Sequence, residues 1–149
     1  YAAKGVPVDL LLRSDQLAEA IELAKRVPGL RGVIDHIAKP RIAEGRMEPW
    51  AEQIKELASY PNLYCKLSGM VTEADRSGWK AEQFVPYVRH VLECFGPDRV
   101  LFGSDWPVCL LAASYGEVVD VLESALPDSW GDAEKAKLFG GNAQAFYRL

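Results

Sequence analysis

The sequence predicts an α/β fold in which short parallel strands alternate with helices. Short apolar segments rich in β-branched residues alternate along the chain with longer segments whose apolar residues recur at helical spacing. Gly, Pro and Asn residues separate the two kinds of segment. Strands that alternate with helices pair in parallel through right-handed crossovers. No linker or low-complexity stretch divides the 149 residues, so we expect a single domain over residues 1–149.

Four segments are predicted to be strands. Each is short and largely apolar, which is typical of parallel strands covered on both faces. The predicted strands are Val6–Leu12, Arg31–Ile37, Leu63–Ser68 and Arg99–Gly103.

Six segments are predicted to be helical. In the first, Leu17, Ile21 and Ala24 recur on one face, and Pro28-Gly29 ends the pattern. Pro86 is compatible with its helix only near the start, because proline lacks the backbone N–H. Gly140-Gly141 is predicted to end the fifth helix. The predicted helices are Asp15–Val27, Glu48–Tyr60, Ala81–Phe95, Tyr115–Leu126, Asp132–Phe139 and Asn142–Tyr147.

Composition excludes several classes of protein. The chain is 49% hydrophobic with a formal charge of −4, so disorder is disfavoured. Its longest apolar runs fall far short of the ~20 residues that span a membrane, and we expect no membrane partner. The pI of 5.2 and the absence of a Lys/Arg cluster argue against nucleic-acid binding. Three cysteines without CxxC spacing and no visible signal peptide indicate reduced thiols in a cytoplasmic protein.

The polar residues that follow the predicted strands are the main functional signal. The active sites of parallel α/β sheets and barrels form at the carboxyl ends of the strands, and all four predicted strands deliver polar side chains there. These residues are Arg13 after the first strand, Asp35 and His36 at the end of the second with Lys39 shortly after, Lys66 and Ser68 at the end of the third, and Ser104 and Asp105 after the fourth.

Asp105 is the strongest candidate among them. It lies between Gly103-Ser104 and Trp106-Pro107, where glycine permits close backbone approach and proline fixes the exit from the strand. A carboxylate held there can bind a metal or take a proton from water. The alternative is an aspartate that caps the next turn.

His36 is one of two histidines and lies at a predicted strand end beside Asp35. Its imidazole could be a metal ligand, a general base or a group that polarises a carbonyl. The alternative is a buried histidine bonded to a backbone carbonyl. His90 lies within a predicted helix, and we expect it to have a packing or surface role. Cys109 has no base in the sequence that pairs with it, which argues against a nucleophilic role.

Four further residues are candidates for contacts with a substrate. Lys66 lies inside a predicted strand, where an ammonium group is costly unless it reaches a partner or a wet cavity. Lys39 and Arg13 could bind an anionic or oxygen-rich ligand, although a solvated arginine is the commoner case. Trp106 is either a wall of the pocket or part of the core.

Several catalytic motifs are absent from the sequence. Neither GxxxxGK[ST] nor GxGxxG follows a predicted strand, and there is no GxSxG segment. Neither HxH nor HExxH occurs, so histidines of this chain alone do not assemble a zinc site.

Three segments resemble the amidohydrolase-related family. They are residues 33–40 (VIDHIAKP), 62–69 (NLYCKLSG) and 102–107 (FGSDWP), and residues 142–147 (NAQAFY) look like the C-terminal helix of that family. The family includes lactonases that act on L-fuconolactone, L-rhamnonolactone and 2-pyrone-4,6-dicarboxylate, and some decarboxylases. The sugar-lactonase branch is the most similar.

The resemblance implies a (β/α)8 TIM-barrel hydrolase, of which this chain resembles the C-terminal half. Its four βα units and C-terminal helices match that half, while the HxH of the family's first strand is missing. Asp105 would activate water, and His36 would polarise a lactone carbonyl. Both could instead ligate one divalent metal, zinc or manganese, although some members need no metal. By position only, Lys39 and Lys66 would contact a small lactone or carboxylate substrate, and Trp106 and Arg13 stay candidates from the sequence pattern.

Two other interpretations stay open at this stage. One is a non-catalytic half-barrel or pseudo-enzyme with two exposed sheet edges. Such a half-barrel would form a homodimer or pair with a missing half. A small flavodoxin-like binding domain is a further alternative, although no cofactor motif supports it.

Overall fold

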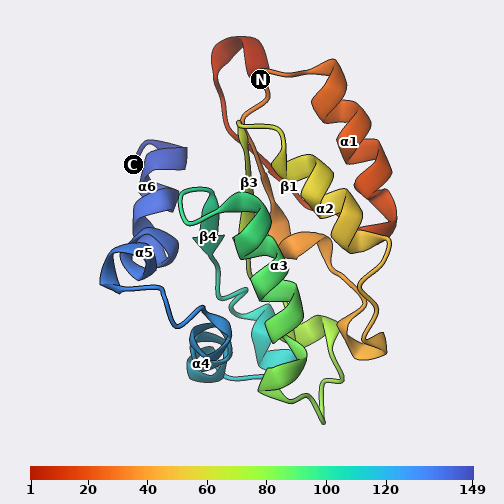
Figure 1. Ribbon diagram of the computed structural model, residues 1–149, viewed down its shortest axis with the longest axis vertical. Helices are drawn as coiled ribbons and strands as arrows, with labels where there is room; N and C mark the ends of the chain where they lie inside the picture. The colour runs from red at the N-terminus through yellow and green to blue at the C-terminus, as the bar shows by residue number, and fades with distance from the viewer.

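A computed structural model (Figure 1) describes residues 1–149 and contains one four-stranded sheet. All neighbouring strands are parallel, and their order in the sheet is their order in the sequence. This confirms the predicted parallel α/β class. The strands are β1 (Val8–Leu10), β2 (Gly32–Ile34), β3 (Leu63–Leu67) and β4 (Val100–Phe102).

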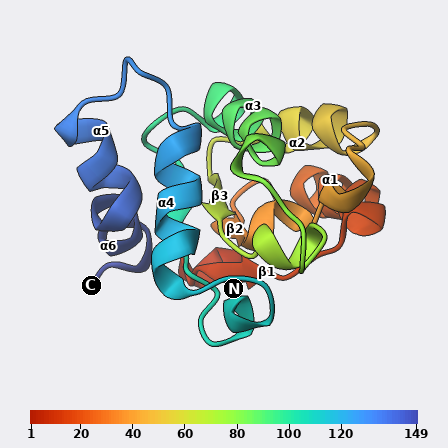
Figure 2. The ribbon, with the colours of Figure 1, turned by 90° about the horizontal axis from the view of Figure 1, so that it is seen from below.

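Three crossover helices connect the strands, and three further helices follow β4. The crossover helices pack on one face of the sheet (Figures 1 and 2). The first three also pack against one another in sequence order. The crossover helices are α1 (Leu17–Arg26), α2 (Trp50–Ala58) and α3 (Val85–Phe95). The later helices are α4 (Tyr115–Ala125), α5 (Asp132–Ala136) and α6 (Asn142–Tyr147).

Alternation along the strands divides the apolar side chains between two cores. Ile34, Cys65 and Val100 belong to a cluster of 34 buried residues that fills the space between the sheet and its helices. Val33 and Leu101 point to the opposite face, where they pack with Phe146 of α6. Successive strand residues face opposite sides of a sheet, so each strand contributes to both layers.

Helix α6 also ties the chain ends to the amino end of the sheet. The Arg31 guanidinium, just before β2, donates hydrogen bonds to the carbonyl oxygens of Gly5 at 2.8 Å and of Phe146. The Tyr147 hydroxyl donates to Asp9 Oδ1 of β1 at 2.6 Å. Through Asp9, Tyr147 also reaches Lys66, whose Nζ atom lies 6.0 Å from the centroid of the Tyr147 ring.

The predicted strand Arg31–Ile37 is too long, and the difference lies in the candidate site. Strand β2 ends at Ile34, and Asp35–Ala38 forms a tight turn. His36, Ile37, Ala38 and Lys39 all have left-handed φ values between 46° and 57°. The apolar run concealed this turn, because buried apolar residues occupy both strand and turn.

The helix predictions are correct in type, and the bounds predicted for Asn142–Tyr147 are those of α6, but the other predicted helices are too long by one or more residues. The first turns at Ser14–Gln16 and Ala81–Gln83 are 3₁₀-helical, and Pro86 lies in the first turn of α3 as predicted. The prediction that Gly140-Gly141 ends a helix is wrong. These glycines lie in a π-helical turn, Lys137–Gly141, that leads directly from α5 into α6.

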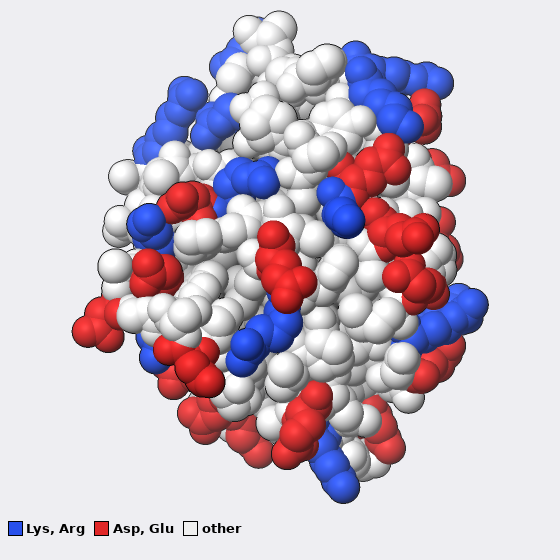
Figure 3. All heavy atoms as spheres, in the orientation of Figure 1, with Lys and Arg blue, Asp and Glu red and all other residues white.

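The surface carries both signs of charge. On the face seen in Figure 3, Lys and Arg side chains are interspersed with Asp and Glu side chains, and no basic stripe crosses it. Cys65, Cys94 and Cys109 are all unpaired thiols. The structure contains no helix with the length and apolar character needed to span a membrane.

Candidate active site

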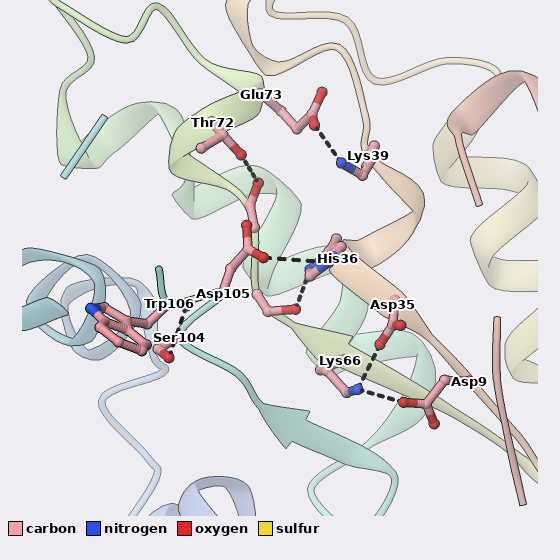
Figure 4. A network of polar contacts seen from close by, with 12 residues as sticks. Asp9, Asp35, His36, Lys39, Lys66, Thr72, Glu73, Ser104, Asp105 and Trp106 are labelled. Atoms are coloured by element: carbon pink, nitrogen blue, oxygen red, sulfur yellow. Dashed lines mark hydrogen bonds and ion pairs between the residues drawn. The ribbon is translucent and has the colours of Figure 1, made fainter. Parts of the chain in front are cut away.

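The structure brings His36 and Asp105 together at the carboxyl edge of the sheet (Figure 4). His36 follows β2 and Asp105 follows β4, and Nε2 of His36 lies 3.6 Å from Oδ1 of Asp105. Their side chains are 18% and 14% exposed, so both are largely withdrawn from water but still reachable. An imidazole and a carboxylate in such contact are groups that hold, donate and accept protons.

A left-handed turn aims the His36 ring at Asp105. L-residues pay roughly 1–2 kcal/mol each in this conformation, and the β-branched Ile37 is among the residues that adopt it. Burial compensates for this strain, since Ile37 and Ala38 are fully buried. Trp50 Nε1 also donates a hydrogen bond to the carbonyl oxygen of Ile37 at 2.7 Å. Strain held by its surroundings in this way is a feature of functional sites.

Ser68 and Gly69, just after β3, hold the other side of the His36 ring. Oγ of Ser68 lies 2.8 Å from Nδ1 of His36, and Ser68 is 1% exposed. Gly69 has a φ of +62°, and a Cβ atom built there would lie 2.7 Å from Nδ1 of His36. Only glycine therefore gives the ring this position.

Lys66 belongs to a second cluster, on the same face of the sheet as Asp9 and Asp35. Its Nζ atom lies 2.6 Å from Oδ1 of Asp35 and 3.2 Å from Oδ2 of Asp9. Burial opposes the charge of Lys66, but hydrogen bonds and attraction from Asp35 and Asp9 together outweigh burial and raise the pKa of Lys66. Lys66 thus has the partners that a lysine in a covered strand requires.

Lys39 lies on the rim above this cluster, at the end of the left-handed turn. Its Nζ atom contacts Oε1 of Glu73 at 3.3 Å, and both side chains are about one third exposed. The charge of Lys39 is therefore matched by a carboxylate of the same chain.

The other two candidates are not drawn into the cluster. The side chain of Arg13 is 76% exposed and pairs with Asp15 at 3.8 Å. Trp106 is 64% exposed, and it follows Asp105 directly. His90 has the predicted packing role: its Nε2 atom donates to the carbonyl oxygen of Ala51 at 2.8 Å, away from the site.

Sequence reasoning placed Ser68 among the polar residues at the strand ends without assigning it a contact, and it did not single out Glu73 or Asp9. Ser68 carried a usable signal, because it lies two residues after Lys66 and therefore on the same face of the strand. The close approach predicted for Gly103 is present, since a Cβ atom there would lie 3.0 Å from Cβ of Ser68. Glu73 lies in a loop turn whose position only the folded chain defines.

His36 and Asp105 have the chemistry of two zinc ligands, an imidazole nitrogen and a carboxylate oxygen. Their separation of 3.6 Å is near the roughly 3.4 Å between two ligands of a tetrahedral zinc ion. No group of three or more His, Cys, Asp or Glu side chains in this chain is placed to hold a metal ion. The two residues therefore fit part of a metal site.

Comparison with known sequences identifies relatives of the whole chain. The family profile described as Amidohydrolase matches residues 2–149. An L-fucono-1,5-lactonase from Burkholderia ambifaria is 43% identical over 150 residues, which cover 99% of this chain and 51% of that protein. The chain thus spans about half the length of the curated relatives it matches, and it corresponds to their C-terminal half.

Solved structures give the same result. An amidohydrolase from Burkholderia multivorans, crystallised with bound zinc, has a TM-score of 0.93 and is 38% identical over 99% of this chain and 54% of its own. A TIM-barrel protein from Bordetella bronchiseptica has a TM-score of 0.65 at 20% identity, over 99% of this chain and 47% of its own. The four βα units therefore correspond to half of a TIM barrel, and the chain belongs to the amidohydrolase family.

Proposed function

We propose that this chain carries the C-terminal half of the active site of a lactone hydrolase, with Asp105 as general base and His36 as the group that polarises the carbonyl. The observation that carries the proposal is the contact between Asp105 and His36 at the carboxyl edge of the sheet. Relatives named as lactonases, which match this chain along nearly its whole length, support it.

The chemistry follows from the two side chains. Asp105 takes a proton from water as the water oxygen attacks the lactone carbonyl carbon. His36 donates a hydrogen bond to the oxyanion that forms. When the tetrahedral intermediate collapses, the ring C–O bond breaks, and the leaving oxygen takes up the proton that Asp105 accepted. The product is the open-chain hydroxy acid.

A divalent cation is compatible with this site, and a zinc-bound neighbour supports it. His36 Nε2 and Asp105 Oδ1 would be its ligands from this chain. When bound, such an ion supplies Lewis acidity at the carbonyl and lowers the pKa of a bound water.

We further propose that the substrate is a neutral sugar lactone rather than a dicarboxylate. Both lysines near the site are already paired, Lys39 with Glu73 and Lys66 with Asp35 and Asp9. Together with Asp105, four carboxylates surround two ammonium groups, so the residues of this rim repel a dianion. Arg13 and Trp106 remain candidates for contacts with the hydroxyl groups of a sugar at the outer rim.

The assignment of Asp105 is tested by Asp105→Asn in the full-length protein. We expect turnover of L-fucono-1,5-lactone to fall by at least 10³-fold with an unchanged circular dichroism spectrum, because an amide cannot accept the proton from water. Asp128→Asn, which changes an exposed aspartate, is the matched control. Near wild-type turnover in Asp105→Asn would contradict the assignment and favour a non-catalytic role for the chain.

The substrate class is tested by comparing two lactones in the same assay. We expect kcat/KM for L-fucono-1,5-lactone to exceed that for 2-pyrone-4,6-dicarboxylate by at least 10-fold. The preference should shrink in Glu73→Gln, which releases Lys39 to bind an anion. Equal or faster hydrolysis of the dicarboxylate by the unmodified protein would rule out the neutral class.

A further inference from the structure

The imidazole of His36 lies between two groups with different hydrogen-bonding abilities (Figure 4). Nδ1 lies 2.8 Å from the Ser68 hydroxyl, and Nε2 lies 3.6 Å from Asp105. A neutral imidazole carries its proton on one nitrogen, so one nitrogen donates while the other accepts. The partner of Nδ1 must therefore donate a hydrogen bond when Nε2 carries the proton, and accept one when Nε2 does not.

We expect His36 to adopt opposite tautomers in the cation-free site and in the cation-bound site. An ionised carboxylate only accepts hydrogen bonds, so without a cation the favourable arrangement has the proton on Nε2, directed at Asp105. Nδ1 then accepts a hydrogen bond from the Ser68 hydroxyl. With a divalent cation between Nε2 and Asp105, Nε2 must present its lone pair, the proton is on Nδ1, and the Ser68 oxygen accepts.

A serine hydroxyl is one of the few groups that can serve both states. It donates or accepts by rotating its hydrogen, whereas a carboxylate or carbonyl partner only accepts and would hold the proton on Nδ1. Ser68 is 1% exposed, and His36 Nδ1 is the hydrogen-bonding partner of its hydroxyl. Gly69 allows close approach of the His36 ring, and Gly103 allows close approach of Ser68. The ring and the hydroxyl therefore keep their relative position.

We propose that Ser68 is a positioning residue whose hydroxyl reverses its hydrogen bond to His36, donating in the cation-free site and accepting when a divalent cation occupies it. The inference rests on the proposed function for the divalent cation at His36 and Asp105 and for the reaction that the two states serve. The tautomers themselves are properties of this chain and can be observed without a substrate.

The tautomers can be read from the ¹⁵N chemical shifts of His36 and His90 in the full-length protein at a pH of about 8.5, where an ordinary histidine is neutral. In a chelator we expect His36 to carry its proton on Nε2. Titration with Zn²⁺ should move the proton to Nδ1. His90 is an internal reference, because its Nε2 donates to a backbone carbonyl and should keep its proton throughout.

Three outcomes would overturn the inference. The first is a His36 proton on Nδ1 already in the chelator. The second is bound Zn²⁺ with the proton still on Nε2. The third is a Zn²⁺ titration that leaves both His36 nitrogens unchanged.

Variants of Ser68 test whether the hydroxyl is responsible. Ser68→Ala should weaken Zn²⁺ binding by about 10- to 100-fold, because Nδ1–H loses its acceptor. The His36 chemical shifts measure this binding. Ser68→Thr keeps the hydroxyl and should retain most of the affinity. Ser124→Ala, which removes a hydroxyl that donates to the carbonyl oxygen of Val121, is the control. Unchanged Zn²⁺ affinity in Ser68→Ala would show that the hydroxyl has no positioning role.

Turnover of a lactone is measured separately on the same samples. A Zn²⁺-linked change of tautomer without lactone hydrolysis would contradict the proposed function and leave the role of Ser68 intact. Lactone hydrolysis with a His36 tautomer that does not change on Zn²⁺ binding would contradict the role of Ser68 and leave the proposed function intact.

Discussion

Gly69 is the residue that most directly limits the position of His36. A Cβ atom there would overlap Nδ1 of the imidazole and would also require a left-handed φ from alanine. Gly45 has the same kind of φ, +63°, but a Cβ atom at that position would meet no atom within 4 Å, so it isolates the conformational cost. Alanine substitutions at the two glycines therefore distinguish the cost of backbone strain from the effect of displacing His36.

We expect Gly69→Ala to lower turnover by at least 100-fold and to destabilise the protein by more than Gly45→Ala does. Gly45→Ala should cost about 1 kcal/mol, the penalty of the left-handed conformation, with turnover unchanged. Urea denaturation and the lactone assay measure the two effects. Equal effects of the two substitutions on turnover would show that His36 tolerates displacement.

Lys66 forms an ion pair with Asp35, whose side chain is 13% exposed. Lys66→Met removes this partner, and we expect the free energy of unfolding to fall by about 2 kcal/mol, somewhat less than the roughly 3–5 kcal/mol for a fully buried pair. Asp35→Asn in the same background should recover part of the loss, because it removes the unpaired charge.

Lys25→Met is the matched control for Lys66→Met. Lys25 also contacts two carboxylates, those of Glu22 and Glu56, but on the solvent-exposed surface of α1 and α2. Exposed ion pairs contribute little, so denaturation of this variant should match the unmodified protein. A loss in Lys25→Met as large as in Lys66→Met would show that burial is not the cause.

At the scale of elements, the sequence was sufficient for the order and type of the four strands and the main helices. The spacing of apolar residues indicates which face of a segment is buried, and Pro and Gly residues indicate where a segment ends. Both signals come from neighbouring residues in the sequence. The turn at Asp35–Ala38 was missed, because its left-handed backbone is stabilised by a tertiary contact with Trp50, 13 residues beyond Ile37 and outside the local pattern. The same holds for the pairing of Lys39 with Glu73, which depends on how two loops pack.

Helix α6 contributes a pH-dependent contact through Tyr147. Burial, followed by the hydrogen bond to Asp9, raises the pKa of Tyr147 to about 12, against about 10 for an ordinary tyrosine. A group whose pKa is raised by folding stabilises the protein fully below its unfolded pKa and loses this effect as pH rises through the folded pKa. The contribution of Tyr147 should therefore disappear between pH about 10 and about 12.

The comparison with Tyr147→Phe isolates this contribution. We expect the difference in unfolding free energy between the unmodified protein and Tyr147→Phe to be constant from pH 7 to 9 and to decline above pH about 10. The raised pKa of Lys66 acts in the same direction but is common to both proteins. A difference that is flat to pH 12 would contradict the role assigned to this contact.

At the scale of the whole molecule, β1 and β4 are the two edges of an open sheet. Leu11, directly after β1, is exposed, and so are Leu110 and Leu111 in the turn Val108–Leu111 that follows β4 in the sequence. Unpaired strand edges with apolar neighbours favour association with another chain. The 149-residue chain made alone is therefore expected to self-associate, and a homodimer would close both edges.

Sedimentation equilibrium of the 149-residue chain tests this expectation. Leu11→Lys should shift the equilibrium toward the monomer, because a charge beside an edge strand opposes pairing. Leu23→Lys changes an exposed leucine on α1, away from the edges, and should leave the equilibrium unchanged. A folded monomer at every concentration would rule out closure by dimerisation.

The contacts of α6 have a consequence for the order of folding. Each strand pairs with the next strand along the chain, so the sheet assembles from contacts between neighbouring βα units. The bond between Tyr147 and Asp9 instead joins residues 138 positions apart. The entropy of closing a loop grows with its length, and distant contacts are formed late in folding. We therefore expect the docking of α6 to follow the folding transition state, so that Tyr147→Phe speeds unfolding and leaves the folding rate unchanged.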